Sequence, residues 1–136
     1  MSAASPRFAA VLATGELERL YSGLSVLVST AAEGVPCAAL AVFRSLELLL
    51  DDGLLQRSLD PSNTPSLTWA GRETFARSLV ELRETALELP ALAVYACSAS
   101  VETMGLANED VEARLDGARP TPRFLREAGE ARLVYV

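Results

Sequence analysis

The chain contains no histidine and no lysine among its 136 residues. Without histidine it cannot build a Ser-His-Asp or Cys-His nucleophile system, a zinc-protease helix motif or a mixed Cys/His zinc site. Without lysine it cannot form a Schiff base, anchor pyridoxal phosphate or complete a P-loop. A cysteine is therefore the leading candidate for any covalent chemistry.

Cysteine itself is scarce, since only Cys37 and Cys97 are present. Two cysteines are too few for a disulfide scaffold, and they are typical of a reducing compartment. Because no histidine can join them, they cannot complete a closed structural zinc site. We expect no bound metal and no cofactor.

Long apolar runs and excess positive charge are also missing. The longest uncharged windows, residues 20–32 and 89–101, are too short to span a bilayer, and the N-terminus does not resemble a secretion signal. The net charge of −6 argues against a nucleic-acid groove. We expect a cytoplasmic protein with protein or small-molecule partners, no membrane contact, and a single domain over residues 1–136.

Short apolar runs alternate with segments of helical periodicity. This alternation predicts a three-layer α/β/α fold with a parallel sheet of four to five strands, flavodoxin-like topology and right-handed crossovers. The expected strands are residues 7–13, 36–43, 92–97 and 132–136, and the expected helices are residues 16–34, 45–50, 75–89, 108–115 and 121–130.

Residues 51–69 are rich in turn signals and contain little periodicity. A loop of this length in a compact domain is either a mobile flap or an interface element. Trp69, at its margin, can cover a site, bury itself in a neighbouring subunit or belong to the core.

The stretch from Leu92 to Gly105 is where the candidate chemistry gathers. An apolar run that ends at Cys97 is typical of a buried strand, and the small polar residues after it predict a turn into a helix. A thiol at such a junction can have its pKa lowered by the helix end, which makes it a better nucleophile. The alternative is that Cys97 is a small apolar residue packed in the strand.

Five other residues are candidates for binding at the same edge of the sheet. Ser98 and Ser100 can donate hydrogen bonds to an anion on the thiol, or act only as caps. Arg44, after the second strand, can hold an anionic ligand or pair with a surface carboxylate. If the first strand lies beside the third, Thr14 and Gly15 meet Cys97 at a switch-point crevice.

Cys37 lies near the start of its expected strand, away from this edge. We therefore expect Cys37 to be structural. In a parallel sheet the two sulfurs lie toward opposite edges and should not pair.

The segment Val94 to Ser100, followed by Met104, Gly105 and the acidic helix start at Asn108, resembles the DsrE/DsrF/DsrH-like family, including its members labelled peroxiredoxin-like. The likeness extends over residues 20–34, the second strand and residues 121–136. In the sulfur-relay members a cysteine eight residues before a glycine carries a persulfide, a spacing that Cys97 and Gly105 keep.

The resemblance implies a small subunit of a homotrimer or hexamer that accepts sulfane sulfur on Cys97 from a donor protein and passes it to an acceptor protein. Residues 100–104 lack the arginine pair of the relay subunits, so no particular acceptor is implied. A non-catalytic, oligomeric protein-binding subunit is the alternative. A third hypothesis, thiol peroxidase activity, has less support, because Cys97 lacks the Pro-x-x-x-Thr-x-x-Cys arrangement expected around a peroxidatic thiol.

Overall fold

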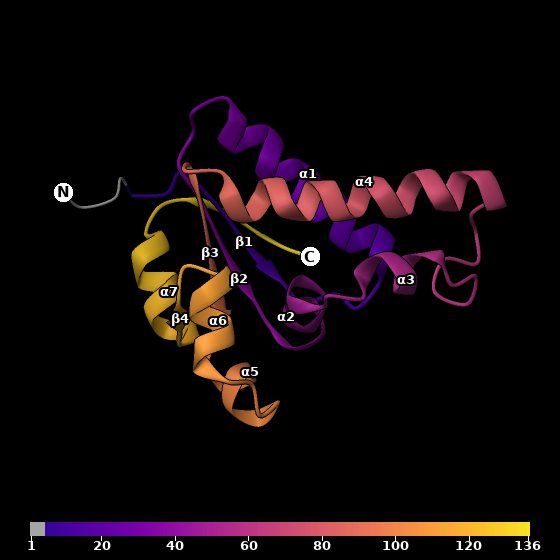
Figure 1. Cartoon of the computed structure of the whole chain (residues 1–136). Coiled ribbons are helices and arrows are strands. Elements are labelled where there is room, and N and C mark those ends of the chain that lie inside the picture. Colours follow the sequence, from indigo (N-terminus) through magenta and orange to yellow (C-terminus); the bar gives the residue numbers. More distant parts are fainter. Residues whose placement is uncertain (1–4) are drawn as a thin grey trace.

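The computed structural model describes residues 5–136, in which helices cover both faces of a five-stranded parallel sheet (Figure 1). This confirms the predicted three-layer α/β/α class. The strands are β1 (Phe8–Leu12), β2 (Cys37–Ala41), β3 (Leu92–Cys97), β4 (Ala118–Arg119) and β5 (Arg132–Tyr135). The helices are α1 (Leu17–Ala32), α2 (Phe43–Leu50), α3 (Leu54–Leu59), α4 (Trp69–Glu88), α5 (Ser98–Thr103), α6 (Asn108–Arg114) and α7 (Thr121–Ala128).

The strand order is β4-β3-β2-β1-β5. Strand β2 lies between β1 and β3, with Leu40 in register with Val11 on one side and with Tyr95 on the other. The expectation that the first strand lies beside the third is therefore wrong. The successive crossovers move the chain one strand at a time in one direction, and β5 then returns to the free side of β1.

The larger core lies on the face of the sheet that α1 and α4 cover (Figure 1). Helix α1 turns its leucines, Leu20, Leu24 and Leu27, toward small strand residues such as Ala39, and none of these side chains is exposed. Alanines in β2 let the helices approach the sheet closely, which agrees with a strand buried at every position. Gly34, at φ 86°, ends the helix as expected.

A smaller core lies on the opposite face, beneath α7. Phe124 of α7 is 1% exposed and packs with Ala38 and Leu40 of β2. Cys97, at the end of β3, belongs to this second cluster. The candidate thiol therefore lies on the side of the sheet that α7 covers.

The segment expected as a long loop, residues 51–69, contains helix α3 and hydrogen-bonded turns. Arg72 of α4 is 6% exposed and donates to the Thr64 hydroxyl at 2.7 Å and to the Thr64 and Leu67 carbonyls at 3.0 and 2.8 Å. Arg72 thus holds the turn before α4 through side-chain bonds to residues five and eight positions earlier. Trp69 is 66% exposed, which excludes the core among the three roles considered for it.

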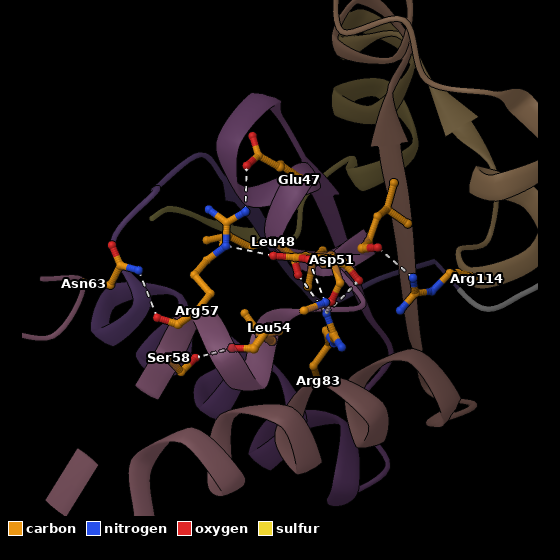
Figure 2. A network of polar contacts seen from close by, with 12 residues as sticks. Glu47, Leu48, Asp51, Leu54, Arg57, Ser58, Asn63, Arg83 and Arg114 are labelled. Carbon is orange, nitrogen blue, oxygen red and sulfur yellow. Dashed lines mark hydrogen bonds and ion pairs between the residues drawn. The ribbon is translucent and has the colours of Figure 1, made fainter. Parts of the chain in front are cut away.

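A second buried arginine of α4 holds the junction between α2 and α3 (Figure 2). Arg83 is 6% exposed, and its Nη1 donates to the carbonyls of Leu48 at 2.9 Å and Asp51 at 2.6 Å. Around it, Arg57 bonds the Asp51 carboxylate at 2.8 Å, and Arg114 bonds the Leu50 carbonyl at 2.7 Å. Arg83 and Arg114 thus donate to carbonyls at and just beyond the end of α2, where the backbone bonds are long or absent, such as Asp51 N–H to Leu48 at 3.4 Å.

Within residues 5–136, no helix combines the length and the apolar character that crossing a membrane requires.

Candidate functional site

Cys97 is the last residue of β3 and the residue immediately before α5. Its side chain is 5% exposed, so the sulfur lies just beneath the surface. The neighbouring Ala99 is exposed and Ser98 is half-buried. The predicted strand-to-helix junction is therefore present, with the thiol at the carboxyl edge of the sheet.

Several hydrogen-bond donors influence the ionisation of Cys97, although its side chain accepts no capping hydrogen bond from the first turn of α5. Burial opposes ionisation, but the N–H and hydroxyl of Ser100, the N–H of Ala99 and the hydroxyl of Thr121 hold the pKa of Cys97 below its usual value. Neutral hydrogen-bond donors thus favour the thiolate, the form that acts as a nucleophile.

Ser100 is the best fixed of these donors. Its side chain is fully buried, and its oxygen accepts a hydrogen bond from the Phe43 N–H at 3.0 Å. Because this bond occupies the oxygen as an acceptor, the hydroxyl proton remains available for the sulfur of Cys97. The start of α2 therefore orients the hydroxyl beside the thiol.

Phe43 has an unusual backbone for this role. Its φ of 42° is the only positive value at a residue other than glycine within residues 5–136, and its side chain is 50% exposed. Bulky residues rarely adopt a positive φ, because the side chain then crowds the backbone. A strained backbone of this kind persists only where the surrounding structure holds it in place. The bond from its N–H to Ser100 ties this strained residue to the thiol site.

Thr121 is the site residue that sequence reasoning missed. It is the first residue of α7, and its hydroxyl is among the groups that lower the pKa of Cys97. Strand β4 brings it near this thiol, because Arg119 is in register with Cys97. Two residues are too few to produce a period, so nothing in the sequence signalled this strand.

Thr14, Gly15 and Arg44 form a separate cluster at the ends of β1 and β2. A Cβ on Gly15 would overlap the Arg44 guanidinium, and the Thr14 carbonyl accepts a hydrogen bond from Ser45 at 2.6 Å. With β2 in between, β1 and β3 are separated by about 10 Å. Thr14 and Gly15 are therefore not adjacent to Cys97, and a binding role for this cluster stays a prediction.

Cys37 contrasts with Cys97 in position and in surroundings. It is the first residue of β2, at the opposite edge of the sheet, and both cysteines are free thiols as predicted. Cys37 is 4% exposed and donates its S–H to the Val35 carbonyl at 3.2 Å. Burial raises the pKa of Cys37, so the two thiols are shifted in opposite directions.

Arg119 is in register with Cys97 but directs its charge elsewhere. Its guanidinium lies 4.2 Å from the centre of the Tyr95 ring, and its Nε bonds Glu127 at 2.9 Å. It therefore braces α7 against the sheet.

In the described part of the chain, residues 5–136, no three histidine, cysteine, aspartate or glutamate side chains gather closely enough to hold a metal ion. The arrangement around Cys97 offers a thiol of lowered pKa, neutral hydrogen-bond donors and a largely covered sulfur. Comparison with protein-family models and with curated proteins finds no match to the chain.

Proposed function

We propose that this chain is a cytoplasmic sulfur carrier of the DsrE-like kind, which holds sulfane sulfur as a persulfide on Cys97. The observation that supports it is the set of donors from Ala99, Ser100 and Thr121 around a thiol at the carboxyl edge of the sheet. Sulfur exchange requires an accessible thiolate but neither a metal nor a general base, and these donors favour the thiolate.

Loading proceeds by attack of the Cys97 thiolate on the terminal sulfur of a donor persulfide. The S–S bond of the donor breaks as the new S–S bond forms, and the donor leaves as a thiolate. In unloading, Cys97 is the leaving group. An acceptor thiolate attacks the terminal sulfur of the Cys97 persulfide, and Cys97 leaves as a thiolate. No electrons enter or leave in either step, so no oxidant is consumed.

The partners in this proposal are a donor protein and an acceptor protein, and the subunit assembles into a homotrimer or hexamer. The same donors that stabilise the Cys97 thiolate also stabilise it as a leaving group during unloading. Ser98, next to Cys97, remains the proposed contact for the incoming persulfide.

The test is the intact mass of the reduced protein after it is mixed with inorganic polysulfide. We expect wild type and Cys37→Ser to gain about 32 Da, the mass of one sulfur atom, and Cys97→Ser to gain nothing. Treatment with dithiothreitol should remove the added mass. A gain that persists in Cys97→Ser and is absent in Cys37→Ser would contradict the proposal.

The second candidate is a non-catalytic subunit that binds other proteins. The observation that favours it is the exposure of apolar side chains, among them Leu133 at 48% and Tyr135 at 75%, while Cys97 is only 5% exposed. Under this alternative, neither wild type nor either cysteine variant takes up sulfur, and Cys97 serves only in packing.

A further inference from the structure

Strand β5 forms an open edge of the sheet. It pairs with β1 on one side, and no strand of residues 5–136 pairs with its other side. Leu133 and Tyr135 lie on the face that α7 covers, in register with Ala9 and Val11, yet they are 48% and 75% exposed. Apolar side chains and free backbone groups therefore meet at this edge.

The hydrogen-bonding groups of β5 alternate between its two sides. The N–H groups of Arg132 and Val136 point to β1, where they bond the carbonyls of Arg7 at 3.0 Å and Val11 at 2.8 Å. By this alternation, the N–H and C=O groups of Leu133 and Tyr135 point outward, away from β1. These outward groups are available for a further strand.

The two edges of the sheet are built differently. At the far edge, β4 has two residues and is followed by Pro120, both of which discourage pairing with another strand. Strand β5 has no proline and no charge between Arg132 and Val136. Natural sheets protect exposed edges, so an unprotected apolar edge indicates a partner.

On its other face, which α1 covers, β5 borders a second apolar surface. A groove of about 520 Å³ lies between β5 and α1, lined by residues that include Val26, Val134 and Tyr135, and Val26 is 51% exposed. The charged residues in the groove are Glu18 and Arg19, which have opposite signs. The grooves of two copies of the chain can therefore lie against one another without bringing an excess of one charge together.

We propose that β5 pairs antiparallel with β5 of a second copy of this chain, across a two-fold axis at Val134. In this register Leu133 faces the partner's Tyr135, and Tyr135 faces the partner's Leu133. Every outward N–H and C=O of these two residues then has a partner, and the exposed leucine and tyrosine cover one another. The occupant is a second copy because the edge complements itself in both backbone and side chains.

This contact does not depend on sulfur chemistry, because β2 and β1 separate β5 from the strand that carries Cys97. A two-fold contact closes a dimer, and it can also join two trimers into a hexamer. It cannot by itself produce a trimer. The interface therefore distinguishes between the two assemblies that the proposed function leaves open.

Sedimentation velocity over a concentration series tests the interface with Tyr135→Lys. Tyr135 is 75% exposed, so the substitution should leave the fold intact, which circular dichroism checks. We expect wild type to contain an even number of subunits and Tyr135→Lys to have half that number. The control Leu125→Lys, at a residue 43% exposed on α7, should behave as wild type.

A monomeric or trimeric wild type would overturn the proposal, as would a Tyr135→Lys variant that keeps the wild-type size. Sulfur loading on Cys97 should be the same in wild type and Tyr135→Lys. Loss of assembly with normal loading would therefore support the interface, whatever the outcome of the sulfur proposal.

A cross-link tests the register. In the proposed pairing, Val134 and the partner's Val134 form a non-hydrogen-bonded pair with Cα atoms about 4.5 Å apart, within reach of a disulfide. Mild oxidation of Val134→Cys, in a Cys37→Ser and Cys97→Ser background, should give a covalent dimer. Ser62→Cys, in an exposed turn far along the chain, is the control, and equal cross-linking of the two variants would contradict the register.

Discussion

Replacing Arg83 with leucine is expected to lower the free energy of unfolding by about 2–4 kcal/mol, because buried carbonyls then lose their only side-chain donor. Arg83 bonds the Leu48 and Asp51 carbonyls at 2.9 and 2.6 Å and is 6% exposed, so water cannot readily replace it. Urea unfolding followed by circular dichroism measures the change.

The matched control is Arg57→Leu, in the same network (Figure 2). The Arg57 side chain is 36% exposed, and it pairs with the carboxylates of Asp51 and Glu47 rather than with buried carbonyls. Ion pairs that solvent reaches contribute about 1 kcal/mol or less. Equal losses in the two variants would show that Arg83 does not act by satisfying the end of α2.

Cys97 is expected to be the faster thiol toward a small alkylating reagent at neutral pH, by a wide margin over Cys37. The pKa of Cys97 is lowered and that of Cys37 is raised, so Cys97 has the larger thiolate fraction at any pH between them. Because both side chains are about equally buried, access does not favour Cys37. Peptide mapping after brief exposure to iodoacetamide measures the two rates.

The pH profile of Cys97 alkylation tests whether the hydrogen-bond donors lower the pKa of this thiol. In Ser100→Ala the thiolate loses a donor, so the rise of the Cys97 alkylation rate should move to higher pH and the rate at neutral pH should fall. Ser98→Ala is the control, because Ser98 is not among the groups that lower the pKa of Cys97. Identical profiles for both variants and wild type would exclude the role given to Ser100.

Periodicity allowed most of the fold to be predicted from the sequence. The expected strand at residues 92–97 coincides with β3, and the helix expected over residues 16–34 is α1, because each element buries one face in a regular pattern. Helix α3 and the first turns of α4 were missed. They are held by buried arginines, Arg72 within the turn before α4 and Arg83 across 35 residues to Leu48, and side-chain bonds of this kind leave no periodic pattern in the sequence.

The candidate site could be predicted only in part. A local pattern places Cys97 and Ser100 at a strand-to-helix junction, and the structure has them there. Strand order is not encoded in periodicity, and for that reason Thr14 and Gly15 were expected too close to Cys97. Thr121 reaches the thiol through the pairing of β4, a contact between segments distant in sequence.

The central claim is that Cys97 carries sulfur that it can give away, and transfer after loading tests it most directly. Wild type loaded with polysulfide is freed of excess reagent, mixed with a small thiol acceptor such as glutathione, and followed by intact mass. We expect the protein to lose about 32 Da while glutathione persulfide appears in equal amount. A protein that takes up no sulfur, or one that keeps its sulfur while glutathione remains unchanged, would contradict a carrier.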